Sequence, residues 1–143
     1  MKRKAQARWT GDLRSGEGHI KLGSGAFEGQ YNFSGRFENG KGTNPEELIA
    51  AALAGCYTMA LNNSLSMAGH NVKGVESTAF VHLEKGETGG SSITRIEITT
   101  RGDVEGISEA EFMKFAEETK SGCIVSRALA AVPISLDVEF AGA

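Results

Sequence analysis

Polar and hydrophobic residues alternate along two stretches in the second half of the chain. Every second residue from Val75 to Leu83 in "GVESTAFVHLEK" falls on one face, and "SSITRIEITTRGD" continues the pattern with Ile96 and Ile98. The glycine-containing segment "EKGETGG" between them is typical of a loose turn. The pattern predicts a β-hairpin with one buried face.

Shorter segments of the same kind predict four more strands. "KAQARWTGD" is interpreted as a strand ending at Gly11-Asp12, and "GHIKLGSGAFEGQYNFSGRF" as two strands joined by a turn at Gly23–Gly25. "VPISLDVEF" is the final strand. Between the early strands and the middle of the chain, "ENGKGTNP" is predicted to be a loop.

A long apolar segment in the middle of the chain predicts a helix from about Pro45 to Met67. Asn44 is placed at the N-cap, so Pro45 falls at the first helical position and Glu47 at the third, where its carboxylate completes a capping box. Gly69 is placed just after the helix end. Because the first half is apolar on nearly every face, we expect the helix in the centre of the fold or in an interface.

The remaining segments predict two further helices. Ser108 and Glu111 form a second capping box at the start of "SEAEFMKFAEETKSG", which ends at Gly122. A short helix then begins at Cys123. Strands, a central helix, a hairpin, helices and a last strand indicate an α+β fold, and 143 residues suit one domain over 1–143.

Composition narrows the functional classes. With 40% hydrophobic and 23% charged residues the chain can bury a core, and its net charge of −3 argues against nucleic acid as a partner. The N-terminus lacks the apolar stretch of a signal peptide, and no run of residues has the length of a membrane span. We therefore expect a cytoplasmic protein that does not contact a membrane.

The chain contains two cysteines, in different settings. Cys56 has Ala52, Leu53, Met59 and Ala60 as its neighbours on the helix, which is typical of a buried core thiol. Cys123 opens a helix, where unpaired N–H groups favour a thiolate, although an ordinary turn residue fits there as well. Two cysteines cannot form a zinc site of the CxxC type, and none of the histidines has ligand spacing. Local reasoning leaves a core thiol and a reactive thiol as equal alternatives.

The wider pattern resembles a known family. "RFENGKGTNPEELIAAALAGCYTMAL", together with "SGCIVSRAL" some sixty residues later, resembles the OsmC/Ohr family of thiol peroxidases, in particular its OsmC branch of osmotically inducible proteins. The resemblance covers nearly the whole chain, from "ARWTGD" to the last strand. One departure is Ile124, which stands where the family often has a proline after its second cysteine; this puts the rigidity of the resolving loop in doubt.

The resemblance implies a mechanism and a site. It implies that Cys56 is the peroxidatic cysteine, Cys123 the resolving cysteine, and Arg36, near the end of an early strand, the activating residue that pairs with Glu46. It further implies reduction of organic hydroperoxides through a sulfenic acid and an intramolecular disulfide, with no metal or cofactor. An external dithiol, of lipoyl type or similar, would restore the thiols.

The resemblance also implies an intertwined homodimer with antiparallel β-sheets around central helices. The spacing in this chain fits that expectation, because Glu46 precedes Cys56 by ten residues, a rise of ~15 Å along the helix axis. We therefore expect Glu46 to serve the Cys56 of a partner chain, on a helix packed antiparallel about a twofold axis. The alternative is a non-enzymatic lipophile-binding or redox-sensing domain with incidental thiols.

Overall fold

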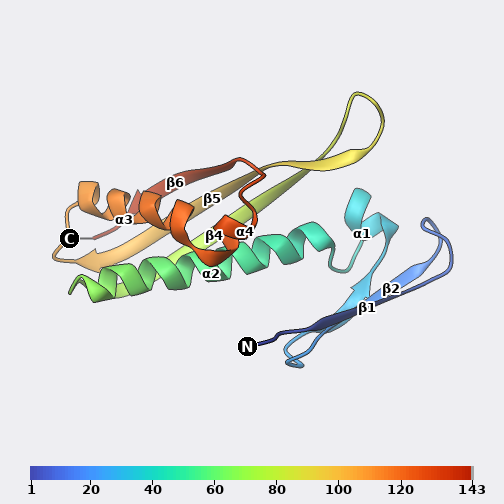
Figure 1. Cartoon of the computed structure of the whole chain (residues 1–143), viewed down its shortest axis with the longest axis horizontal. Coiled ribbons are helices and arrows are strands. Elements are labelled where there is room, and N and C mark those ends of the chain that lie inside the picture. Colours follow the sequence, from blue (N-terminus) through green and yellow to red (C-terminus); the bar gives the residue numbers. More distant parts are fainter. Residues whose placement is uncertain (143) are drawn as a thin grey trace. The chain divides into compact units, whose positions relative to one another are not determined.

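A computed structural model describes residues 1–142, in the element order β1-β2-β3-α1-α2-β4-β5-α3-α4-β6 (Figure 1). Two sheets and four helices confirm the predicted α+β class. The chain divides into two compact units, one of residues Met1–Leu48 and one that begins at Ile49, and each is described by itself. The single domain expected over 1–143 stays a prediction.

The first unit contains an antiparallel sheet in the order β1-β2-β3. Its strands β1 (Ala5–Thr10), β2 (Glu17–Leu22) and β3 (Glu28–Tyr31) confirm the three strands expected at this end of the chain. The expectation that the third strand continues to Phe37 is wrong.

A short helix, α1 (Phe33–Phe37), follows β3 instead. Asn32 is its N-cap, and the Asn32 side-chain oxygen accepts the N–H of Gly35 at 2.7 Å. Asparagine readily makes such local hydrogen bonds, which offer the backbone an alternative to a strand ladder. Arg36 consequently lies in the last turn of a helix and not at the end of a strand.

The long helix α2 spans Pro45–Met67, as predicted from the sequence. The Asn44 side chain accepts the N–H of Glu47 at 2.8 Å, which confirms the N-cap. At the other end Gly69 has φ +89° and donates its N–H to Ser66, in the left-handed conformation that glycine adopts without strain.

The second unit holds the sheet β4-β5-β6, with β4 (Asn71–Lys85), β5 (Ser91–Glu105) and β6 (Ile134–Phe140). The β4–β5 hairpin is confirmed, but β6 runs parallel to β5, so the expectation of purely antiparallel sheets is wrong. The helices α3 (Glu109–Gly122) and α4 (Ile124–Ala128) lie between β5 and β6 in the chain. They form the long crossover that joining two parallel strands requires.

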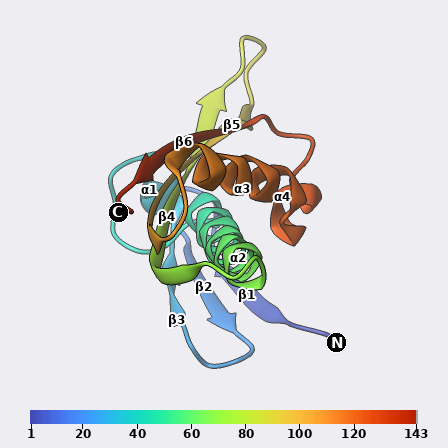
Figure 2. The ribbon, with the colours of Figure 1, turned by 90° about the vertical axis from the view of Figure 1, so that its left-hand side faces the viewer.

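The core of this unit lies between the sheet and its helices. Residues Leu53, Tyr57, Leu61 and Leu65 recur every four positions on α2 and are fully buried. They pack in one cluster with Ile96 and Ile98 of β5 and with Phe112 and Ala116 of α3. Viewed end-on, α3 and this part of α2 lie on the same side of the sheet (Figure 2).

Two large apolar side chains of α2 are nevertheless exposed. Met59 and Met67 are 76% and 81% exposed. By length and composition α2 could cross a membrane, which differs from the expectation that no segment is long enough. A core helix of a water-soluble fold passes the same test; one face of α2 packs in the core, and 22% of the 18-residue window is buried.

Candidate active site

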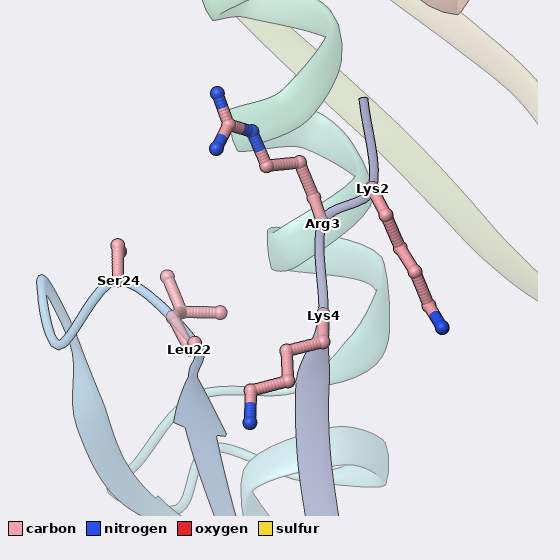
Figure 3. A pocket seen from close by; sticks show the side chains of 6 residues that line it. Lys2, Arg3, Lys4, Leu22 and Ser24 are labelled. Atoms are coloured by element: carbon pink, nitrogen blue, oxygen red, sulfur yellow. The ribbon is translucent and has the colours of Figure 1, made fainter.

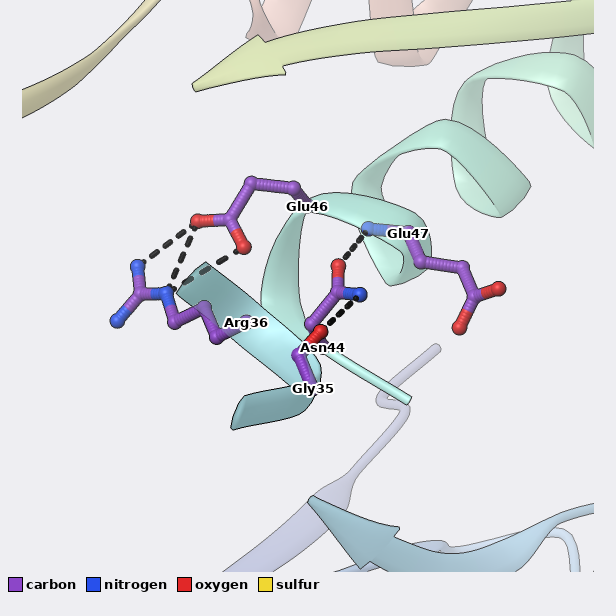
Figure 4. A network of polar contacts seen from close by, with 5 residues as sticks. All are labelled: Gly35, Arg36, Asn44, Glu46 and Glu47. Carbon is purple, nitrogen blue, oxygen red and sulfur yellow. Dashed lines mark hydrogen bonds and ion pairs between the residues drawn. The ribbon is translucent and has the colours of Figure 1, made fainter. Parts of the chain in front are cut away.

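Arg36 and Glu46 form an ion pair within the first unit. The guanidinium donates from Nη2 to Oε1 of Glu46 at 2.8 Å and from Nε to Oε1 and Oε2 at 3.2 and 3.3 Å (Figure 4). Only 9% of the Glu46 side chain is exposed, against 39% of the Arg36 side chain. A planar fork held at two nitrogens has a defined orientation, so the carboxylate fixes the direction in which the cation points.

The pairing expected between these two residues therefore forms inside one chain. The physical reason is local: α1 ends eight residues before α2 begins, and the intervening loop folds back far enough for the last turn of α1 to meet the first turn of α2.

Asn44 connects these two helices. Its side-chain oxygen caps α2 at Glu47, while its Nδ2 donates to the carbonyl oxygen of Gly35 at 3.1 Å (Figure 4). The Asn44 amide thus ties α1, which carries Arg36, to the start of α2, which carries Glu46. The sequence identified only the capping role, because the second contact depends on how the loop folds.

The loop before α2 is fixed against β3. Gly42 has φ +103°, and a Cβ atom there would lie 2.7 Å from the carbonyl oxygen of Gln30, so both conformation and space require glycine. The next residue, Thr43, is buried and donates its N–H to the same carbonyl at 3.1 Å. The segment "GTN" is therefore held in place before the helix begins.

Glu47 departs from the capping box expected for it. Its carboxylate accepts the hydroxyl of Thr43 at 2.8 Å rather than the backbone N–H of Asn44. The hydrogen bond expected from the Asn44 backbone N–H to the Glu47 carboxylate is thus replaced by one from the Thr43 side chain. In α3 the expected box is complete, since Ser108 and Glu111 bind each other's backbone N–H groups.

Both cysteines lie in the second unit and are free thiols. Cys56 is half-buried and packs against the hydrophobic cluster that also contains Cys123. Of its expected neighbours on α2, Leu53 is fully buried and Met59 is exposed, so this part of the helix turns one side to the core and one outward.

Cys123 is the junction between two helices. It ends α3, with its N–H donated to Thr119 at 3.0 Å, and it caps α4. Its sulfur accepts the N–H of Ser126 at 3.3 Å and lies 3.1 Å from the Ser126 hydroxyl oxygen. Cys123 is only 3% exposed, so the predicted helix start is confirmed but its sulfur is enclosed.

Tyr57, next to Cys56, is a buried polar residue of this region. Its hydroxyl donates to the carbonyl oxygen of Ala116 at 3.1 Å, which joins α2 to α3. Burial raises the pKa of Tyr57 well above its usual value of 10, and the charges of Glu117 and Cys123 add to that rise. The phenol is therefore a neutral hydrogen-bond donor across the accessible pH range.

Sequence reasoning did not single out Thr43 or Ser126 as parts of the site. For Ser126 a signal was present, because the spacing Cys-x-x-Ser matches the N-cap and third position of a helix. The spacing alone does not show that the Ser126 side chain faces the Cys123 sulfur, because that contact depends on the fold.

A pocket of about 770 Å³ in the first unit is lined by none of the predicted site residues. Lys2, Arg3 and Lys4 line it together with the turn that follows β2. Their charged ends point in different directions and do not converge on a common point (Figure 3). Within residues 1–142, no group of three or more His, Cys, Asp or Glu side chains is placed to hold a metal ion.

Comparison with known proteins shows which family the chain matches. Residues 38–139 match the family described as OsmC-like protein. The chain is 42% identical to Peroxiredoxin OsmC of Escherichia coli over 138 residues, which are 96% of this chain and 95% of that protein.

Solved structures show the same fold at lower identity. The organic hydroperoxide resistance protein OhrB of Bacillus subtilis aligns with a TM-score of 0.72 and 21% identity, covering 96% of this chain and 97% of that one. An OsmC-like protein of unknown function from Vibrio cholerae aligns with a TM-score of 0.76 and 14% identity, covering 96% and 99%.

Proposed function

This chain belongs to the OsmC-like protein family and is a peroxidase, and we propose that it reduces organic hydroperoxides to alcohols through Cys56 and Cys123. The observation that carries the proposal is a pair of free thiols on one hydrophobic core, in a chain 42% identical over 96% of its length to a peroxiredoxin. Cys56 is assigned as the peroxidatic thiol because this residue is only partly buried, whereas Cys123 is buried.

The reaction proceeds in three steps. The Cys56 thiolate attacks the terminal peroxide oxygen, the O–O bond breaks, and the alkoxide leaves as an alcohol after taking up a proton. The resulting sulfenic acid is attacked by Cys123, which gives a disulfide and water. An external dithiol, for which a lipoyl-type compound is our candidate, then reduces the disulfide by two thiol exchanges.

Arg36 and Glu46 are assigned to the first step. Glu46 binds the Nε and Nη2 side of the guanidinium, and among the described residues Nη1 makes no hydrogen bond. These remaining N–H groups can bind the peroxide oxygens as charge develops on them. The positive charge also favours the thiolate of the attacking cysteine.

We further propose that the working enzyme is an intertwined homodimer in the cytoplasm. Cys56 lies ten positions after Glu46 on the helix, a rise of ~15 Å, too far for one catalytic centre. A twofold axis would bring the Arg36–Glu46 pair of one subunit to the Cys56 of its partner, twice per dimer. The exposed apolar surface of α2 supports this arrangement, because it needs cover in water.

A peroxide-consumption assay with a dithiol tests the proposal. We expect repeated turnover, with cumene hydroperoxide used far more efficiently than hydrogen peroxide, since each buried methylene contributes ~0.8 kcal/mol. Cys56→Ser should abolish consumption. Cys123→Ser should consume about one equivalent and stop at the sulfenic acid. Dimedone labelling of Cys123 in place of Cys56 would reverse the two roles, and a wild-type protein that consumes no peroxide would refute the proposal.

A further inference from the structure

Ser126 is bound to the reacting sulfur of Cys123 by two contacts. Its backbone N–H donates to that sulfur at 3.3 Å, and its hydroxyl oxygen lies 3.1 Å away. Both residues are buried, at 3% and 4% exposure, so water does not surround the sulfur. Ser126 is therefore a protein group placed to accept the proton of the Cys123 thiol.

The chemistry of the resolving step requires such a proton transfer. Cys123 attacks the sulfur of the Cys56 sulfenic acid; the S–S bond forms, the S–O bond breaks, and the hydroxyl leaves with one proton as water. The thiol gives up its own proton in the process. The sum of thiol and sulfenic acid is disulfide and water, so no other oxidant or reductant takes part.

A hydroxyl suits both states of the nucleophile. While Cys123 is a thiol, its S–H can donate to the Ser126 oxygen, and once the proton has left, the hydroxyl can rotate and donate to the sulfur. The backbone N–H of Ser126 keeps the sulfur in the same place in both states. An alanine at this position would leave only the backbone contact.

Ser126 also borders a pocket. It lines a pocket of about 320 Å³ together with Lys120 and Arg127, on the side of α4 where the chain leads into β6. Ser126 thus contacts the enclosed sulfur and also lines this pocket.

We propose that Ser126 is a further catalytic residue, which holds the resolving sulfur and passes its proton to water in the pocket beside α4. The inference rests on the proposed function, because it requires Cys123 to be the resolving thiol. It assigns to this serine a role in the disulfide step alone, with none in the attack on peroxide.

Single-turnover kinetics test this assignment. The reduced protein receives one equivalent of cumene hydroperoxide, and dimedone trapping and peptide mapping follow the sulfenic acid and the disulfide over time. The variants are Ser126→Thr and Ser126→Val, which have the same shape but differ in the hydroxyl. Ser121→Ala is the control, because Ser121 lines the same pocket but makes no contact with the sulfur in the described structure.

We expect Ser126→Val to slow disulfide formation at least about tenfold, equivalent to ~1.4 kcal/mol, so that the sulfenic acid on Cys56 accumulates before the disulfide appears. Ser126→Thr should restore most of the rate, and Ser121→Ala should match the wild type. Equal disulfide rates for the threonine and valine variants would overturn the inference. Failure of the proposed function would look different, since Cys123→Ser would then sustain turnover with the dithiol as well as the wild type does.

Discussion

At the scale of single residues, the planar fork of Arg36 is the feature that a conservative change would remove. Lysine keeps the charge but cannot bind Glu46 at two nitrogens while presenting a third to substrate. We expect Arg36→Lys to lower the rate of Cys56 oxidation about tenfold or more, measured by stopped-flow with cumene hydroperoxide.

Glu46→Gln is the matched test of orientation. Glutamine has the same shape and still offers one acceptor, but it lacks the negative charge that holds the guanidinium. The oxidation rate should fall while the melting temperature stays nearly unchanged. An unaltered oxidation rate in both variants would remove this ion pair from the peroxide step.

At the scale of elements, the start of α2 depends more on Asn44 than on Glu47. Asn44 caps the helix and also binds the Gly35 carbonyl, whereas the Glu47 carboxylate accepts the Thr43 hydroxyl. Asn44→Ala should lower the free energy of unfolding by about 1 kcal/mol and reduce activity, because α1 loses its tie to α2. Glu47→Ala, the control, should cost less stability and keep activity. Denaturant unfolding and turnover of both variants test this prediction. A catalytically inactive Glu47→Ala would assign the role of Glu46 to Glu47 instead.

The start of α3 should give a dependence of stability on pH. Hydrogen bonds from the backbone and the hydroxyl of Ser108 lower the pKa of Glu111 below its usual value of 4.5. A carboxylate with a lowered pKa stabilises the fold at pH above 4.5, and this contribution is lost as pH falls below that value. Glu111→Gln should therefore reduce the fall in melting temperature between pH 5 and pH 3, relative to wild type. A variant whose melting temperature falls just as steeply would contradict it.

At the scale of the whole molecule, the exposed apolar surface of α2 predicts association. The protein should sediment at twice its chain mass of 15.1 kDa. Met59, 76% exposed on α2, should lie in the interface, so Met59→Glu should raise the dimer dissociation constant at least about tenfold. Met113→Glu on α3, where Met113 is 45% exposed, is the control. A wild-type monomer in analytical ultracentrifugation would refute the dimer and with it the shared site.

Helix limits were predictable because their signals are local. Asn44 before Pro45, Gly69 after Met67, and the pair Ser108 and Glu111 each satisfy orphan backbone groups within one helical turn, so a few neighbouring residues suffice to place α2 and α3. The prediction that a strand continues after β3 is wrong. Asn32 follows strand-like residues directly, and as a helix cap it outweighs their preference.

By itself the sequence determined the order and type of most elements, the two cysteines and the family pattern around them, because periodicity, caps and motifs are read from adjacent residues. Tertiary structure alone decided that β6 runs parallel to β5, since strand partners are chosen by packing across the crossover through α3 and α4. It also decided that Arg36 meets Glu46 inside one chain and that Ser126 faces the Cys123 sulfur. These contacts depend on loop paths and on burial, for which no short stretch of residues carries a signal.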